Sequence, residues 1–399
     1  MWLTADLPGT GGVFKSQEED FVVEELPAYL PCGTGEHLFL LVEKQGLTTL
    51  DLVRRLARQC NIAERDIGYA GMKDARGMTR QWLSLPASAA QGRLSETNDR
   101  FRILKTALHR NKLRIGHLRG NRFRILLREV EEQALPHAQA ILCELAVRGV
   151  PNRFGAQRFG ALSNTHLIGR ALLAGEFEKA AQAMFTTGEN IRNPRWKAGA
   201  ELFAAGNFEK ALEVLPETCR TERSVVKALA QGKTPRAALL ALPQRLLRLY
   251  ISAWQSAIFD RVVEARLDTL GQILAGDLAM KHANGACFAV SDPLQEQARA
   301  DAWEISPTGP LPGAKKMLWA TEAAGAIEQK ALAGDKDLLE SSALPAGLRP
   351  LGERRALRVP LGEASAELVS DGLQLTFTLP AGSYATCVVE EVMKSAVAS

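Results

Sequence analysis

The sequence predicts an α+β protein in which a mainly helical domain interrupts a β-rich one. Strand patterns occupy both ends of the chain, whereas residues 163–270 are Ala-rich and mainly helical in pattern. A stretch containing Gly, Pro and Ser at 331–350 has the composition of a connector, and strand patterns return after it. β-rich ends around a helical middle are the arrangement expected when one domain is inserted into another.

Length and composition exclude several classes of protein. The 399 residues are enough for about two or three domains, and 46% hydrophobic residues argue against a disordered chain. No stretch approaches the roughly 20 apolar residues of a membrane helix, and the first ten residues, MWLTADLPGT, lack the features of a secretory signal. We therefore expect a soluble, cytoplasmic protein.

Metal and cofactor motifs are not found in the sequence. The six cysteines are scattered singly without a C-x-x-C pair, which argues against a zinc site and against a disulfide framework. The six histidines show no i, i+4 pairing on an expected helix. The glycines at 9–12 are not followed by a helical pattern, so they fit neither a P-loop nor a dinucleotide fingerprint.

The first part of the chain has a mixed pattern. Strands are expected around Phe21 to Glu25 and over Gly35 to Lys44. Thr48 or Thr49 can then cap a helix whose apolar residues recur at helical spacing up to Asn61. The segment RQWLSLP predicts a further strand.

Two strands and a helix are expected next. Residues 101–128 suggest two strands around the turn-prone Gly116 and Gly120-Asn121, and Leu135 to Arg148 has the pattern of an amphipathic helix. Near the end of the chain, Asp371-Gly372 predicts a hairpin turn between two strands, and a last helix follows from about Ser383.

The helical middle contains a short internal repeat. The segment AGEFEKA at 174–180 recurs as AGNFEKA at 205–211, which fits helical hairpins. A solenoid needs at least three such units and two are found, so a helical-repeat scaffold is a weak alternative.

Charge is more informative in its distribution than in its sum of +4. Residues 101–128 contain nine Lys or Arg and no acidic residue, and residues 220–248 contain seven basic residues and one acid. Such runs can be solvated faces, but two of them in a nearly neutral chain favour a polyanion such as RNA as partner.

Three segments carry candidate functional residues. In GYAGMKDARGMTRQW, Asp74 lies between Lys73 and Arg76, where positive charge favours an ionised carboxylate; a cap or a surface ion pair is the alternative. In GHLRGNRFR, Phe123 lies among basic residues and could stack on an unpaired base, or be a core residue of the strand. In PNRFGAQRFG at 151–160, two arginines offer phosphate contacts, or the segment is an interdomain turn.

Several of these segments together resemble the TruD class of tRNA pseudouridine synthases. The matching stretches follow the order of the family and are EEDFVVEE (18–25), GEHLFLLVEKQGLTT (35–49), GYAGMKDARGMTRQW (68–82), HRNKLRIGHLRGNRFRI (109–125), GVPNRFGAQRFG (149–160), AWQSAIFDRVVEAR (253–266), SPTGPLPG (306–313) and LPAGSYATCVVEEV (379–392). The similarity is lower between about 165 and 245.

The resemblance implies a fold with a catalytic domain that has a mixed, largely antiparallel sheet. We expect residues 1–151 and 351–399 to form this domain, and residues 152–350 to form the inserted TRUD domain, a mainly helical α+β unit.

The resemblance also implies roles for five residues. Asp74 is expected to be the catalytic nucleophile, and Lys15 its basic partner. Asn121 and Phe123 are expected to shape the uridine pocket, and Lys73 to contact the substrate.

The implied reaction isomerises a flipped-out uridine of tRNA, by resemblance uridine 13, to pseudouridine. Asp74 would act by attack at C1′ or by proton abstraction at C2′, and the sequence leaves both routes open. No cofactor or metal is expected, because substrate and product contain the same atoms. We expect tRNA as partner and a monomer without membrane or protein partners. A noncatalytic RNA-binding or RNA-folding protein is the alternative from another class.

Overall fold

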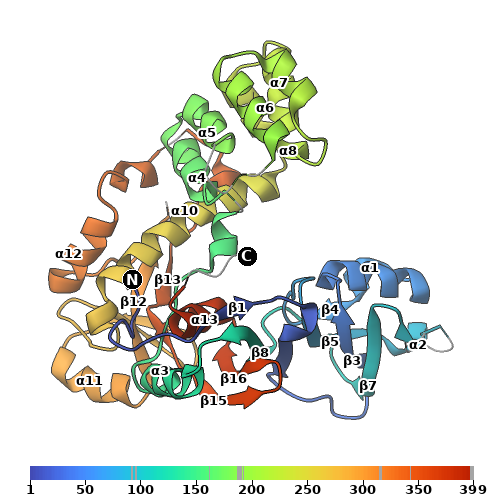
Figure 1. Cartoon of the computed structure of the whole chain (residues 1–399), viewed down its shortest axis with the longest axis vertical. Coiled ribbons are helices and arrows are strands. Elements are labelled where there is room, and N and C mark those ends of the chain that lie inside the picture. Colours follow the sequence, from blue (N-terminus) through green and yellow to red (C-terminus); the bar gives the residue numbers. More distant parts are fainter. Residues whose placement is uncertain are drawn as a thin grey trace. The chain divides into compact units, whose positions relative to one another are not determined.

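The computed structural model describes residues 1–90, 93–94, 97–160, 162–186, 191, 193–313, 317–341 and 343–395 (Figure 1). It divides into two compact units. One unit contains Met1–Val150 and the described residues from Val359 onward, and the other contains Pro151–Arg358. The expected insertion is therefore present. Residues 351–358 group with the inserted unit, because strand β13 (Glu353–Ala356) pairs with β12 (Ile305–Leu311) of that unit.

The first unit is built on a mixed sheet of ten strands within its described residues. The strands are β1 (Gly11–Phe14), β2 (Phe21–Pro27), β3 (His37–Gln45), β4 (Gly68–Tyr69), β5 (Met78–Pro86), β6 (Thr97–Asn98), β7 (Phe101–His109), β8 (Leu118–Val130), β15 (Gly362–Val369) and β16 (Gly372–Pro380). Their order is β15-β16-β8-β2-β5-β3-β7-β6, with β1 on β8 and β4 on β5. The pair β2 and β5 is parallel, and the other registers in this sheet are antiparallel. The expectation of a mixed, largely antiparallel sheet is confirmed.

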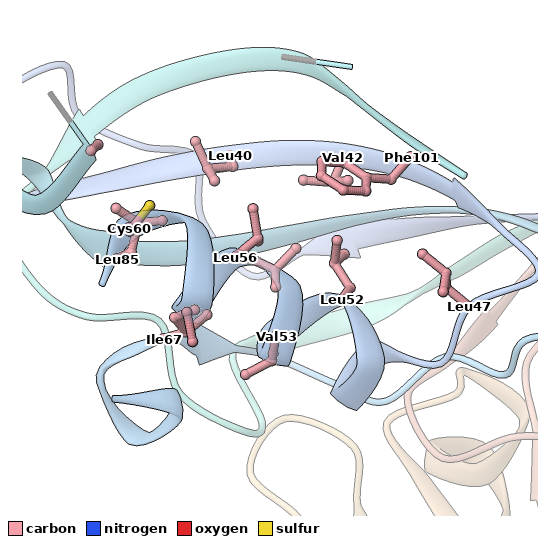
Figure 2. Close-up of a cluster of buried hydrophobic side chains, with 13 residues drawn as sticks. Leu40, Val42, Leu47, Leu52, Val53, Leu56, Cys60, Ile67, Leu85 and Phe101 are labelled. Atoms are coloured by element: carbon pink, nitrogen blue, oxygen red, sulfur yellow. The ribbon is translucent and has the colours of Figure 1, made fainter. Parts of the chain in front are cut away.

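Helices cover this sheet. They are α1 (Thr49–Cys60), α2 (Ala87–Ala90), α3 (Ala134–Arg148) and α13 (Ala385–Met393). The Thr48 side chain caps α1 by accepting a hydrogen bond from the Asp51 amide, and Asn61 ends it in the left-handed conformation, as the sequence predicts. Figure 2 shows Leu52 and Leu56 of α1 packed in a buried cluster with side chains of the sheet.

One expected turn is absent from its predicted position. Gly120-Asn121 lies inside β8, where Gly120 pairs with Leu26 on one side and with Pro380 on the other. Pairing on both edges outweighs the local turn propensity of the dipeptide. Gly116, with φ of 92°, lies in the connection between β7 and β8, as expected.

The second unit is mainly helical with a small sheet. Its helices are α4 (Thr165–Ala174), α5 (Phe177–Met184), α6 (Pro194–Ala204), α7 (Phe208–Val214), α8 (Arg220–Ala230), α9 (Pro235–Leu240), α10 (Gln244–Ala265), α11 (Pro293–Asp301) and α12 (Glu322–Ala331). Strands β10 (Leu278–Lys281), β11 (Cys287–Ala289), β12 and β13 form the sheet. The strands β9 (Val150–Pro151) and β14 (Arg358–Val359) lie where the chain passes from one unit to the other.

The internal repeat corresponds to two helical hairpins, α4 with α5 and α6 with α7. The second helix of each hairpin begins after a residue with the same backbone conformation, since Glu176 and Asn207 both have φ of −85° and ψ of 64°. The repeated letters therefore reflect a repeated local structure.

Candidate active site

Asp74 lies on an exposed loop that the protein holds firmly by its backbone. The loop connects β4 to β5, and the Asp74 side chain is accessible to solvent. Its carbonyl group accepts a hydrogen bond of 3.0 Å from the Lys44 ammonium. The carbonyls on either side, of Lys73 and Ala75, accept from the amides of Thr49 and Gly46. Three successive carbonyls are thus fixed, while the carboxylate is left open to a ligand.

Lys73 has a structural position that sequence reasoning did not anticipate. Its ammonium lies 3.2 Å from Glu25 Oε1, and these side chains are 7% and 0% exposed. The other oxygen of Glu25 accepts a hydrogen bond from the Trp82 amide. The ion pair ties the Asp74 loop to β2 and β5. With its charge neutralised inside the protein, Lys73 is suited to holding this loop rather than to contacting substrate.

Lys44 is a second buried cation beneath the loop, and the sequence analysis did not select it. The residue is 1% exposed, and its ammonium donates to the carbonyls of Leu47 and Asp74. Burial lowers the pKa of Lys44 to about 8, and the charge of Asp74 opposes this shift. The strand pattern could have revealed it: Leu40, Val42 and Lys44 alternate along β3 and share a face, so a lysine stands where a core residue is expected.

Lys15 lies near the same carboxylate. Partial burial lowers the pKa of Lys15, and the charge of Asp74 opposes the shift, as expected for neighbouring opposite charges. Its ammonium lies 3.9 Å from the centre of the Phe21 ring, a cation–π contact. Its backbone is left-handed, with φ of 57°, which is uncommon for a residue other than glycine and is found more often at functional sites.

Phe123 is a buried member of an aromatic cluster. It is 5% exposed, and its ring centre lies 6.1 Å from that of Phe21 and 5.5 Å from that of Phe377. Phe123 therefore packs as a core residue of the strand, which is the alternative that the sequence left open. Because Phe21 also contacts Lys15, the cluster extends from Phe123 to the cation beside Asp74.

Strand register places the candidate residues on one face of the sheet. Lys44 is opposite Thr79, Thr79 is opposite Val23, Val23 is opposite Phe123, and Phe123 is opposite Phe377. Strands lie about 4.8 Å apart, so Lys44 and Phe123 are separated by roughly 14 Å across the row. Residues far apart in sequence are thereby brought onto one face of the sheet.

Asn121 lies two residues from Phe123 on the same face of β8. Its Oδ1 atom is buried and has no hydrogen-bond partner among the described residues. A buried acceptor without a partner costs roughly 1–3 kcal/mol. Such an atom is suited to accept a hydrogen bond from a ligand.

The basic run at 101–128 is partly neutralised. Glu43 pairs with Arg80 at 2.9 Å and with Arg102 at 3.0 Å. Arg122 pairs with Glu363, and Arg128 pairs with Asp20. Arg122 also alternates with Phe123 along β8, so it lies on the opposite face of the sheet. The positive charge that the sequence shows in this run is therefore neutralised at Arg102, Arg122 and Arg128.

The segment 151–160 makes internal contacts in the second unit. The Phe154 amide donates to Asp260 Oδ1 at 3.0 Å, and Arg158 Nε donates to Ser256 Oγ at 3.1 Å. Burial raises the pKa of Asp260 to about 7. Both acceptors belong to α10, so this segment is anchored to that helix.

Metal-binding and membrane-spanning features were searched throughout the described chain. No group of three His, Cys, Asp or Glu converges there as metal ligands. Among those same residues, no helix combines the length and the apolar character needed to cross a bilayer.

Comparison with known proteins identifies the family. The family model for tRNA pseudouridine synthase D (TruD) matches residues 1–392. The tRNA pseudouridine synthase D of Geobacter metallireducens is 52% identical over 394 residues, covering 98% of this chain and 97% of the relative. That of Syntrophotalea carbinolica is 48% identical over 396 residues and covers 99% of each chain.

A solved structure agrees with these sequence relatives. The structure from Methanosarcina mazei, a candidate tRNA pseudouridine synthase D (TruD), superposes with a TM-score of 0.82 at 28% identity, covering 99% of this chain and 96% of that one. A mixed sheet with an inserted unit is thus the fold of a pseudouridine synthase. The chain is a member of the TruD family.

The buried ion pair gives a first prediction. Replacing Glu25 with Ala leaves the Lys73 ammonium buried without its partner, which should lower the free energy of unfolding by about 3–5 kcal/mol. Urea denaturation monitored by circular dichroism measures the change. The double variant Glu25→Ala with Lys73→Met should recover part of the loss; equal stabilities of wild type and Glu25→Ala would show that the pair does not hold the loop.

Proposed function

We propose that this protein isomerises uridine 13 of tRNA to pseudouridine and that Asp74 performs the chemistry on the ribose. The observation that carries the proposal is the setting of Asp74. Its carboxylate is open to a ligand, its backbone is fixed, and the charges of Lys15 and Lys44 act on it. Membership of the TruD family supports the reaction class and the type of substrate.

The reaction breaks the bond between N1 and C1′, turns the uracil and joins C5 to C1′. In one route, Asp74 attacks C1′ and uracil leaves with the bonding electrons of N1; uracil C5 then displaces the carboxylate. In the other, Asp74 takes the C2′ proton as uracil departs with the bonding electrons of N1, which leaves a double bond between C1′ and C2′. Return of that proton to C2′ then makes C1′ the electrophile to which uracil C5 bonds. In both, C5 finally loses its hydrogen as a proton and N1 gains one, so atoms and electrons balance.

The two lysines serve Asp74 differently. Lys15 is partly exposed and stabilises the ionised carboxylate through its charge. Lys44 is buried and acts as a positioning residue, since its ammonium holds the Asp74 carbonyl and adds positive charge beneath the carboxylate. An ionised carboxylate is the form needed as nucleophile or as base.

The uridine must leave its stack to reach Asp74, which costs a few kcal/mol. A hydrogen bond from the uracil N–H to Asn121 Oδ1 can offset part of this free energy. Phe123 packs between Phe21 and Phe377, so it supports the apolar wall of the pocket more than it offers an open stacking surface.

Release of tritium from tRNA labelled at uridine C5 tests the proposal. Wild type should release tritium, and Asp74→Asn should reduce the rate by at least about a thousandfold, because the amide is neither nucleophile nor base. Arg124→Ala is a matched control, since Arg124 is exposed on the face of β8 opposite Phe123.

Two results would contradict the proposal. Equal release by wild type and Asp74→Asn would remove Asp74 from the chemistry. Binding of tRNA by wild type without release on any tRNA would favour a noncatalytic RNA-binding or RNA-folding protein.

The lowered pKa of Lys44 predicts how kcat depends on pH in the alkaline range. Above pH 8 Lys44 loses its proton, so kcat should fall about tenfold for each pH unit while KM for tRNA stays nearly constant. In Lys44→Arg the guanidinium keeps its charge, and this fall in kcat should move above pH 10. Steady-state kinetics from pH 6 to 10 measures both effects.

Lys15→Arg is the control for this assignment, because the pKa of Lys15 is also lowered. A fall in kcat that moves only in Lys15→Arg, or one that is unchanged in Lys44→Arg, would show that Lys44 does not determine the profile.

A further inference from the structure

A groove of about 540 Å³ lies in the first unit. It is formed by the beginning of α1, by the segment that leads into β4, and by the connection between β7 and β8. Its lining residues are Leu50, Val53, Glu64, Arg65, Ile67, Gly68, Tyr69, Lys112, Leu113, Arg114 and Ile115. The volume is within the range of sites that hold small ligands.

The groove has an apolar lining with a large exposed side chain. Ile67 and Leu113 are buried, with 3% exposure each, whereas Ile115 is 75% exposed. Few side chains of this size remain so open without a partner, although a single one has little meaning by itself. Because Ile115 stands beside a groove, its side chain offers a contact surface to a planar, partly apolar group such as a nucleobase.

The charged lining is predominantly positive. Arg65, Lys112 and Arg114 carry positive charge, against a single acid, Glu64, which lies 4.0 Å from Arg54. The side chains of Arg65 and Arg114 are exposed and have no ion-pair partner among the described residues. Lys112 donates to the backbone carbonyl of Arg65 and so joins two walls of the groove.

This arrangement differs from that of three other cations in the basic run. Arg102, Arg122 and Arg128 are held by carboxylates, as described above. The cations of the groove are not neutralised in this way, so their charge is available to an anion from outside the protein.

The groove is next to the candidate active site. Tyr69 lines it, and the chain continues from there into the loop that carries Asp74 five residues later. Five residues span at most about 18 Å. The amide of Gly116, which follows Ile115, donates to the Ala70 carbonyl at 3.0 Å, so the wall of the groove and the loop are joined directly.

We propose that this groove binds an unpaired nucleotide of the substrate RNA close to the target uridine. Arg65, Lys112 and Arg114 contact its phosphates, and the apolar lining with Ile115 contacts its base. The proposal rests on the proposed function, because that function supplies an RNA whose target reaches Asp74. It adds a second point of attachment that keeps the strand in place after the uridine has left its stack.

The test measures tRNA binding and turnover separately. Three variants are compared with wild type: Arg65→Ala with Arg114→Ala, Ile115→Ala, and the control Arg124→Ala. Equilibrium binding of unmodified tRNA is measured from 50 to 200 mM salt, and tritium release is measured at saturating and at limiting tRNA.

The double arginine variant should raise Kd and KM at least tenfold and leave kcat within twofold of wild type. The slope of log K against log salt should become shallower by about 1.4, since each lost phosphate contact removes about 0.7 for a single strand. Ile115→Ala should raise Kd about fivefold or more, as expected for the loss of a buried apolar contact with the base, without a change in slope. Arg124→Ala should match wild type.

An equal Kd for tRNA in the double arginine variant and in Arg124→Ala would overturn the proposal. The groove would then serve a different partner, such as a protein. An unchanged Kd in Ile115→Ala would overturn the contact with a base. If the variants weaken tRNA binding but wild type releases no tritium, the proposed function fails while the groove assignment holds. The two failures are therefore distinguishable.

Discussion

The buried ion pair between Lys73 and Glu25 is the constraint on which the candidate site depends. It ties the loop after β4 to the sheet, and hydrogen bonds to three successive carbonyls hold the rest of that loop. A carboxylate that acts on a sugar carbon must be held in place before the substrate arrives, because positioning supplies a large part of the rate. The protein meets this requirement by burying Lys44 and Lys73 beneath the loop and leaving the Asp74 side chain open to solvent.

The arrangement has an energetic cost. A buried ammonium such as that of Lys44 is desolvated, and its lowered pKa is the direct sign of this cost. Its hydrogen bonds to Leu47 and Asp74 offset part of it. Local strain at Lys15, whose backbone is left-handed, is a further departure from an ideal structure. These departures occur around the same carboxylate, as is usual where function competes with stability.

Much of the fold could be predicted from sequence because its signals are local. The capped helix after Thr48, the hairpin at Asp371-Gly372 and the helical middle follow from periodicity and turn residues. The turn at Gly120-Asn121 could not be excluded in this way, since only pairing with β2 and β16 shows that it is strand. The family motifs and their order gave the reaction class, which composition alone did not.

The site was predictable in part for the same reason. Asp74 stands out through its motif, whereas Lys73 in that motif is used for an ion pair with a residue 48 positions away. The sequence shows the positive charge of the basic run but not which of its cations are neutralised. Their partners, such as Glu43 and Glu363, lie on other strands. Long-range pairing therefore decides which cations remain available to RNA.

The most direct measurement of the central claim is the pseudouridine content of tRNA, mapped by position, after incubation with wild type or Asp74→Asn. The account predicts pseudouridine at position 13 with wild type and an unmodified uridine there with the variant, although the variant still binds the tRNA. Pseudouridine formed equally by both proteins, or formed by neither on tRNA that they bind, would contradict it.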